Sequence, residues 1–296
     1  MAINVTQLHP MFVGEIRDLD PHDPAADAHY PDLQAALDRH AVLIFHGTPM
    51  SQERQVEFCG LFGTLEGAKT DKTILQGKER LKHTLADVSN VAPDDKLFGK
   101  EDRRRMFNLG NMLWHTDSSF KRVPAKYSML HAHSVVPEGG ETQVVDTRAA
   151  WEALPEAMKT RVDGLIAEHS ILHSREKLGF YDFSAEERAA LPPVHRPIVR
   201  DHAESGRRAL YLASHASHIL GMEVPDGRML IAELMEHMTQ REFIYTHHWQ
   251  VGDLMVWDNR CTLHRGRPYD DVNHRRDMRR ATVEDDDPAM EHRDAA

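Results

Sequence analysis

A histidine and an aspartate lie two residues apart in Trp114-His115-Thr116-Asp117. In an extended strand, side chains alternate between two faces, so His115 and Asp117 would point the same way, with Cα atoms roughly 6.6 Å apart. One further histidine would complete a metal site of two imidazoles and one carboxylate. Such a site leaves about three positions of an octahedral ferrous ion open for a cosubstrate and oxygen. We therefore predict that residues 111–120 form an extended metal-binding segment.

The His-x-Asp/Glu spacing is weakly specific by itself, because 21 histidines make chance pairs common. The same spacing recurs at His202 and Glu204, in a polar turn that we predict to lie at the surface. It occurs once more at His292 and Asp294, in an acidic stretch that we expect to be solvated. A structural polar pair at the end of a strand remains the alternative interpretation of the first pair.

A second candidate segment is an apolar strand that runs into the polar turn Trp257-Asp258-Asn259-Arg260, with His264 four residues later. His264 is the candidate for the second imidazole ligand. An ordinary loop histidine is the alternative, because position alone does not distinguish the two.

Two arginines near the C-terminal end, Arg276 and Arg280, are four residues apart. In a strand, Arg276, Met278 and Arg280 would share one face, with the two guanidiniums roughly 13 Å apart. Met278 indicates that this face is buried, and buried arginines need anionic partners such as small-molecule carboxylates. The alternate residues at 275, 277 and 279 mix charges and are expected to face solvent. A surface charge run with internal aspartate partners explains the spacing equally well.

Composition bounds the class of protein. The 296 residues are 41% hydrophobic, which suffices for a packed core, and the net charge of -11 argues against a nucleic-acid binder. No apolar run approaches the roughly 18 residues of a membrane span, and the first residues lack the pattern of a secretion signal. With only two cysteines, Cys59 and Cys261, a cytoplasmic location is the expectation.

The pattern of apolar residues predicts one mainly β domain over residues 1–296 with inserted helices, closer to a jelly roll than to a βαβ fold. Residues 64–110 are polar and irregular, so they form either an active-site loop or a disordered segment. Residues 287–296 are expected to be frayed. The predicted strands are 41–45, 127–136, 141–145, 243–249 and 254–257. The predicted helices are 32–40, 52–62, 147–165 with a break near Pro155, a short one after the capping box at Ser184, and 226–240 with Met229, Ile231, Leu234 and Met238 inward.

The motifs in their order resemble the ferrous-iron, 2-oxoglutarate-dependent dioxygenases of the taurine dioxygenase family. Within that family they resemble most the 2,4-dichlorophenoxyacetate, or aryloxyalkanoate, dioxygenases. The resemblance runs from about residue 9 to residue 286 and is weakest over 68–108. The motifs that carry it are Asn111…Trp114-His115-Thr116-Asp117, Gly139-Gly140-Glu141-Thr142, Trp257-Asp258-Asn259-Arg260…His264-Arg265 and Arg276…Arg280-Ala281-Thr282.

The resemblance implies a double-stranded β-helix, a jelly-roll variant, with His115, Asp117 and His264 as iron ligands. It also implies that Thr142 and Arg276 bind the distal carboxylate of 2-oxoglutarate. The loop before Arg276 is a residue longer than in taurine dioxygenase, so Arg275 could exchange with Arg276, although strand parity favours the latter.

For the substrate, the resemblance implies that Arg280 holds the anionic group and that Asn111 lines the pocket beside it. His215 and Lys69 are further candidates for substrate contacts. A structural histidine and a solvated surface lysine are the respective alternatives.

The implied reaction consumes oxygen and 2-oxoglutarate, and ascorbate would serve as reductant in vitro. An aryloxyacetate would be hydroxylated on the carbon beside its ether oxygen, releasing a phenol and glyoxylate with succinate and carbon dioxide. One alternative is a taurine, alkylsulfonate or alkyl-sulfate dioxygenase, and another is a non-catalytic jelly-roll protein that binds a small acid. The expected partners are the small aryl acid and further copies of the chain, as a dimer or tetramer.

Overall fold

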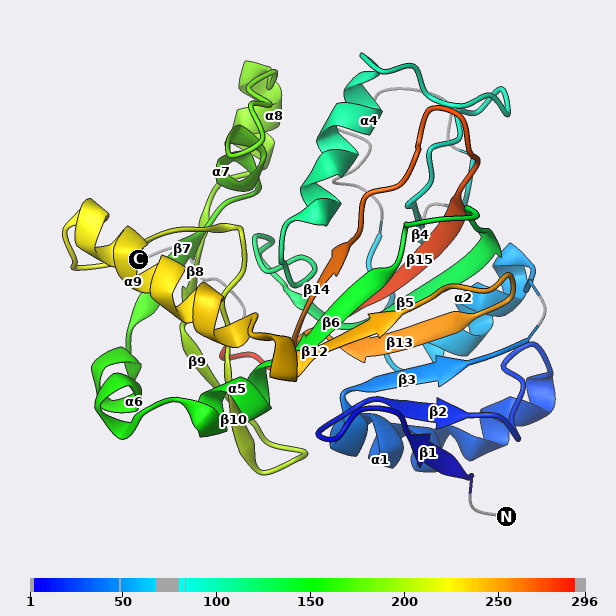
Figure 1. Ribbon diagram of the computed structural model, residues 1–296, viewed down its shortest axis with the longest axis horizontal. Helices are drawn as coiled ribbons and strands as arrows, with labels where there is room; N and C mark the ends of the chain where they lie inside the picture. The colour runs from blue at the N-terminus through cyan, green and yellow to red at the C-terminus, as the bar shows by residue number, and fades with distance from the viewer. Residues whose placement is uncertain (1–2, 48, 68–79, 83, 291–296) are drawn as a thin grey trace.

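The computed structural model describes residues 3–47, 49–67, 80–82 and 84–290, and Figure 1 shows a large twisted sheet beside a helix-rich region. The described strands are β1 (Val5–Gln7), β2 (Gly14–Ile16), β3 (Val42–Phe45), β4 (Leu85–Asp87), β5 (Ala125–Ser134), β6 (Thr142–Asp146), β7 (Ile166–His169), β8 (Val194–Pro197), β9 (Val199–His202), β10 (Arg207–Leu210), β11 (Ala216–Ile219), β12 (Ile244–His247), β13 (Leu254–Asp258), β14 (Thr262–Gly266) and β15 (Asp277–Glu284). The described helices are α1 (Tyr30–His40), α2 (Gln52–Gly60), α4 (Arg103–Asn108), α5 (Thr147–Ala153), α6 (Glu156–Val162), α7 (Ile171–Glu176), α8 (Ala185–Ala190) and α9 (Val224–Met238), with 3-10 turns η1 (Pro24–His29), η2 (Leu109–Met112) and η3 (Arg241–Phe243). In this part of the chain, no helix is long and apolar enough to cross a membrane.

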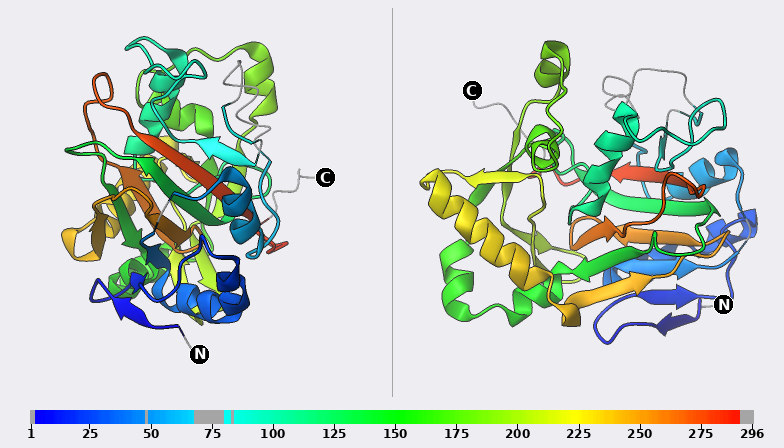
Figure 2. Two further views of the ribbon diagram at one scale, coloured as in Figure 1. Left: turned by 90° about the vertical axis from the view of Figure 1, so that its right-hand side faces the viewer. Right: turned by 45° about the horizontal axis from the view of Figure 1, so that its top comes forward.

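Two sheets enclose one core. The large sheet has the order β1-β2-β3-β13-β5-β15-β4, and its only parallel pair among the described strands is β2 with β3. A smaller antiparallel sheet has the order β12-β6-β14. Leu130 and Met255 of the large sheet belong to the same buried cluster as Val144 of the small sheet. The sheets therefore face each other, as the two further views in Figure 2 also show.

Helices α1 and α2 cover the other face of the large sheet. Leu33 and Leu37 of α1 and Phe58 of α2 belong to a second buried cluster. The sheet strands contribute alternate residues to this cluster, those that point toward the helices. Strand β3 shows why its sequence is apolar throughout. Its Val42 and Ile44 face the small sheet while Leu43 and Phe45 face the helices, so both faces of this strand are buried. The predicted elements at 32–40 and 41–45 are confirmed.

A helix-rich region lies beside the two sheets. Strands β11-β7-β8 form a three-stranded sheet, and β9 pairs with β10. Helix α9 packs its Leu230, Ile231 and Leu234 into the buried cluster of this region. The prediction that Met229 also points inward is wrong, since its side chain is 72% exposed. Each residue of a helix advances about 100°, so a residue next to a buried position can lie on the open face.

Several predicted boundaries shift in the structure. The polar stretch at 64–110 contains β4, which pairs with β15 at the edge of the large sheet, and helix α4. The stretch at 111–120 is not a strand over its length, because it begins in η2 and ends in a turn at Asp117–Phe120. The C-terminal segment is held as far as Met290, which is buried and accepts a hydrogen bond from Arg196 Nη1 through its carbonyl. Residues 291–296 lie outside the described residues.

The packing of α9 predicts opposite stability effects for two of its residues. Leu234→Ala removes a fully buried side chain and should lower the free energy of unfolding by about 2–5 kcal/mol. Met229→Ala, on the exposed face, should change it by less than about 0.5 kcal/mol. Urea unfolding followed by circular dichroism measures both. Equal losses for the two variants would contradict the burial of α9.

Candidate functional site

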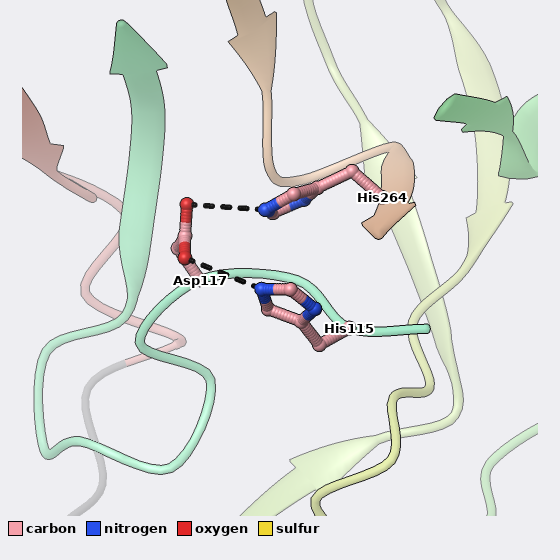
Figure 3. Close-up of side chains that lie close together, drawn as sticks. All are labelled: His115, Asp117 and His264. Carbon is pink, nitrogen blue, oxygen red and sulfur yellow. Dashed lines mark ion pairs between the residues drawn. The ribbon is translucent and has the colours of Figure 1, made fainter. Parts of the chain in front are cut away.

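The three side chains predicted as metal ligands, His115, Asp117 and His264, point toward one another, as Figure 3 shows. His115 Nε2 lies 3.8 Å from Asp117 Oδ1, and His264 Nε2 lies 3.6 Å from Asp117 Oδ2. One ligand atom from each residue lies within 4.8 Å of the other two, and all three residues are buried. His115 and Asp117 therefore lie close together as predicted, although only the backbone around Trp114–Thr116 is extended.

A two-bond backbone bridge fixes the histidines relative to each other. His115 N donates to His264 O at 3.0 Å, and His264 N donates to His115 O at 2.8 Å. His264 is in turn held by β14, which pairs with β6. His115 Nδ1 lies 2.7 Å from the carbonyl oxygen of Leu113, which can only accept, so Nδ1 carries the proton. The lone pair of His115 Nε2 is thereby directed to the centre of the site.

The protonation states of His115, Asp117 and His264 suit the binding of a cation. Burial lowers the pKa of both His115 and His264, so both imidazoles are neutral near pH 7 and can donate lone pairs. Burial alone would raise the pKa of Asp117, but the Arg280 guanidinium and the hydrogen bond from Ser128 help to hold that pKa below its usual range. Two neutral imidazoles and one ionised carboxylate are the donor set that suits non-haem Fe(II). The residues therefore fit a ferrous ion.

A second group of possible ligand atoms does not form a comparable site. His202, Asp258 and Cys261 also lie close together and are buried. The Asp258 carboxylate, however, already accepts from Arg260 Nη2 at 2.7 Å and bonds His202 Nε2 at 2.9 Å. The group is a buried ion-pair network. The prediction that His202 lies at the surface is wrong, because β9 directs it toward the turn after β13.

A cavity adjoins the metal site and contains both predicted arginines. Arg276 and Arg280 line it together with His115, His264 and Thr142, and Asn111 lies on its wall. Much of the remaining wall is apolar, built from Val88, Phe98, Leu109, Met112, Leu130 and Trp257. The cavity can therefore hold an anionic group and an apolar body next to a bound metal.

Both arginines line the same cavity, although Arg276 directly precedes β15 and the register of that strand shifts between Asp277 and Met278. Met278 between them is fully buried, and both guanidiniums reach the cavity. Arg280 Nη1 lies 2.5 Å from Asp117 Oδ1, which places this cation directly beside the candidate metal ligands.

The Arg276 guanidinium is buried, and this burial lowers its pKa. It donates hydrogen bonds to the carbonyl oxygens of Gly140 at 3.3 Å and Val88 at 3.4 Å, and it lies over the Tyr269 ring, 5.6 Å from the ring centroid. Among the described residues, no carboxylate forms an ion pair with it, so the site lacks one negative charge that a ligand carboxylate would supply. Gly140, with φ +70°, brings its backbone close to this side chain.

The opposite face of this segment agrees with its prediction only in part, because Arg275 is exposed and Asp277 is not. Asp277 was expected to face solvent, but it is buried and pairs with Arg80 Nη1 at 2.7 Å. Arg275 is partly exposed and pairs with Asp95 at 2.7 Å. Both partners, Arg80 and Asp95, come from the polar stretch at 64–110. The burial of Asp277 therefore depends on residues far away in the sequence, and the alternation of charges around it could not predict it.

Thr142 at the start of β6 is held by a residue that the sequence did not single out. Trp249 Nε1 donates to Thr142 Oγ1 at 3.0 Å, which leaves the Thr142 hydroxyl proton free to donate toward the cavity. The Trp249 ring packs edge-on against His247, which bonds Asp253 at 3.0 Å. One of four tryptophans after a strand is too general a signal to have identified Trp249.

Asn90 is a second residue that sequence reasoning missed. Its Oδ1 accepts from Arg276 N at 2.8 Å, and its Nδ2 donates to the carbonyls of Asp271 and His274 at 2.7 and 2.8 Å. It therefore holds the loop that delivers Arg276. Its sequence neighbours carry no recognisable motif.

The two remaining predicted substrate residues, His215 and Lys69, lie in different surroundings. His215 is buried and packs against Phe120 with ring centroids 4.7 Å apart, and its ring lies 6.2 Å from that of His115. It is not among the residues that line the cavity. His218 is partly exposed and lies 3.6 Å from Glu168. Lys69 lies outside the described residues.

Three comparisons relate the chain to known proteins. The family model described as taurine catabolism dioxygenase TauD, TfdA family matches residues 4–282. An alpha-ketoglutarate-dependent 2,4-dichlorophenoxyacetate dioxygenase from Cupriavidus pinatubonensis is 47% identical over 287 residues, 97% of this chain and 99% of the relative. An (S)-phenoxypropionate/alpha-ketoglutarate-dioxygenase from Sphingobium herbicidovorans is 36% identical and covers 86% of this chain and 84% of its own. The crystal structure of AAD-2 in complex with Mn(II) and N-oxalylglycine has a TM-score of 0.92 and 44% identity, covering 96% of this chain and 98% of its own.

The geometry predicts that metal binding depends on His264. His264→Ala removes one of three ligand atoms and should weaken Mn(II) binding by more than roughly 100-fold, beyond the 10–100-fold typical of an outer partner. Anaerobic titration followed by electron paramagnetic resonance measures the affinity. His218→Ala is the matched control, since this partly exposed histidine lies outside the cluster. Unchanged Mn(II) affinity of His264→Ala would contradict the site.

Proposed function

The chain belongs to the TauD, TfdA family of dioxygenases, and on this premise we propose that it is a 2-oxoglutarate-dependent aryloxyalkanoate dioxygenase. The reaction hydroxylates the carbon beside the ether oxygen of an aryloxyacetate or related acid. The resulting hemiacetal breaks into a phenol and glyoxylate, or into the matching 2-oxoacid for a longer chain. The observation that supports the proposal most is the cavity, which is lined by two arginines and an apolar wall and adjoins the three candidate metal ligands.

His115, Asp117 and His264 are the residues that would hold Fe(II). Bound Fe(II) with 2-oxoglutarate and oxygen supplies the oxidising chemistry, in which one oxygen atom enters the substrate and the other enters succinate as carbon dioxide leaves. The protein's own task is to keep both imidazoles neutral, to keep Asp117 ionised and to align the substrate.

Arg276 and Thr142 would bind the distal carboxylate of 2-oxoglutarate. The buried Arg276 guanidinium, without a carboxylate partner among the described residues, is suited to a bidentate bond with that group. Thr142 would add a hydrogen bond from its hydroxyl, because its oxygen already accepts from Trp249. The cosubstrate would then lie along β6 and β15, with its other end toward the metal cluster.

Arg280 would bind the carboxylate of the substrate, with Asn111 beside it. Because Arg280 lies next to Asp117, the carbon adjacent to that carboxylate would come close to the metal. The ring would pack on the apolar wall of the cavity, where Phe98, Leu109 and Met112 lie, and this wall would exclude water from the reacting carbon. His215 would act on the substrate only through its packing near His115, and a role for Lys69 stays a prediction.

The runner-up within the same family is a taurine-type sulfonate or alkyl-sulfate dioxygenase. It would use the same metal and cosubstrate residues, and its substrate also carries an anion for Arg280. The apolar part of the cavity wall favours an aryl acid over taurine, because it would pack against a ring. Asp271, the carboxylate among the lining residues, is already paired with Arg105 Nε at 2.8 Å.

We also propose that the two facing sheets form a double-stranded β-helix within a single domain, which the shared core of β5, β6 and β13 supports. A homo-oligomer, as a dimer or tetramer, and a cytoplasmic location complete the proposal. The two free, buried thiols of Cys59 and Cys261 agree with a reducing compartment. Light scattering on a sizing column tests the oligomeric state.

A substrate panel tests the proposed reaction. Purified protein with Fe(II), ascorbate and 2-oxoglutarate should release phenol and succinate in equal amounts from phenoxyacetate, and little succinate with taurine. Phenol is measured colorimetrically and succinate by chromatography. More succinate with taurine than with any aryloxy acid would favour the runner-up. No oxygen consumption with any aryloxy acid would rule out the proposed substrate class.

Arg276 and Arg275 provide a matched pair for the cosubstrate. Arg276→Ala should raise the KM for 2-oxoglutarate by roughly 30-fold or more, since losing a charged, hydrogen-bonded partner costs about 2–5 kcal/mol. Arg275→Ala should leave that KM within about twofold, because Arg275 is partly exposed and pairs with Asp95. Steady-state kinetics at saturating substrate measures both. The reverse order of the two variants would assign the cosubstrate to Arg275.

A further inference from the structure

Asp117 lies just beyond the part of the backbone that β pairing holds. The bridge between His115 and His264 ends the paired region, and Asp117 begins a turn in which Ser118 has a φ of +53°. A ligand in a turn has no ladder of hydrogen bonds to fix it. Other contacts must therefore set the position and rotation of its carboxylate.

Asn259, in the turn between β13 and β14, supplies the contacts to the backbone. Its Oδ1 accepts from Asp117 N at 3.1 Å and from Trp257 Nε1 at 3.0 Å. Its backbone oxygen accepts from the Thr116 hydroxyl at 2.7 Å. These four residues are at least 97% buried, so no solvent competes for the bonds. Asn259 thereby ties the turn that carries Asp117 to the strand before His264.

A second contact chain reaches the carboxylate itself. Asn259 Nδ2 donates to Ser128 Oγ at 2.9 Å, and Ser128 Oγ lies 2.7 Å from Asp117 Oδ2. The directions are fixed, because Asn259 Oδ1 is occupied by N–H donors and an ionised carboxylate can only accept. The amide therefore donates to Ser128, and the Ser128 hydroxyl proton is directed to Asp117.

We propose that Asn259 and Ser128 are positioning residues that set the rotation of the Asp117 carboxylate and thereby the affinity of the site for its divalent metal ion. The inference rests on the proposed role of Asp117 as a ligand. Ser128 holds Oδ2, while Oδ1 lies 2.5 Å from Arg280 Nη1. Without Ser128, the carboxylate rotates toward Arg280, and its oxygens leave the positions between the two imidazoles. Outer partners of metal ligands typically contribute 10–100-fold to affinity.

Ser128→Ala tests the final bond of this chain, with Ser134→Ala as matched control. Both serines lie on β5, and the Ser134 hydroxyl has no hydrogen-bond partner among the described residues. Mn(II) affinity, measured by titration of the metal-free protein, should fall about 10-fold or more in Ser128→Ala, which corresponds to about 1.4 kcal/mol. It should stay within about twofold in Ser134→Ala. Equal effects in the two variants would overturn the proposal.

Thermal unfolding separates positioning from a purely structural role. The unfolding midpoint of the metal-free protein should fall in Ser128→Ala, because Asn259 Nδ2 loses its buried acceptor. The rise in midpoint on adding Mn(II) should shrink as well, because ligand stabilisation follows affinity. A lower metal-free midpoint with unchanged Mn(II) affinity would mean that Ser128 is only structural, and it would overturn the proposal.

Asn259→Asp tests the first bond of the chain. The new carboxylate cannot donate to Ser128, so the Ser128 hydroxyl turns to donate to it and leaves Asp117. The loss of Mn(II) affinity in Asn259→Asp should be smaller in a Ser128→Ala background, since the two residues act in series. Fully additive losses would overturn the relay. A wild-type protein that binds no Mn(II) would refute the proposed function, whereas normal binding with an unaffected Ser128→Ala would refute only this inference.

Discussion

The backbone bridge between His115 and His264 is the interaction on which the rest of the site depends. Two hydrogen bonds of 3.0 and 2.8 Å place residues almost 150 positions apart side by side, so that both imidazoles face one point. The bridge continues the pairing of β14 with β6 and therefore inherits the rigidity of the small sheet. A site on a sheet holds its ligands within the narrow geometric limits that a metal requires.

Burial around that bridge has a second consequence. It keeps both imidazoles neutral, and it would force Asp117 toward protonation if the neighbouring cation were absent. Arg280 thus has two effects: it stabilises the ionised ligand, and it presents a cation to the cavity. This coupling explains why Arg280, the proposed anion-binding residue, lies next to the three candidate metal ligands. In an apolar cavity, the Asp117 carboxylate and the Arg280 guanidinium each offset the cost of burying the other.

Sequence reasoning predicted many elements correctly where a local rule was sufficient. The capping box at Ser184, the helix at 32–40 and the strand at 41–45 follow from caps and apolar spacing, and the structure confirms them. The predictions failed where a local pattern had two solutions. Met229 lies beside the apolar face of α9 and is exposed, and the stretch at 111–120 is mostly turn. The buried state of His202 and Asp277 depends on distant partners, Asp258 and Arg80, that no local rule brings together.

The candidate residues of the site could be named from the sequence, because imidazoles, a carboxylate and two arginines four residues apart constrain the chemistry regardless of the fold. The sequence also carried the family resemblance across nearly the whole chain. Only the tertiary structure brings the His115–Asp117 pair next to His264 and, among the described residues, leaves the His202–Glu204 pair without a second histidine. It alone also decided that Trp249, Asn90, Asn259 and Ser128 support the site. The physical reason is that these supports act through hydrogen bonds between residues far apart in the chain, and the types of residues that make such bonds are common everywhere.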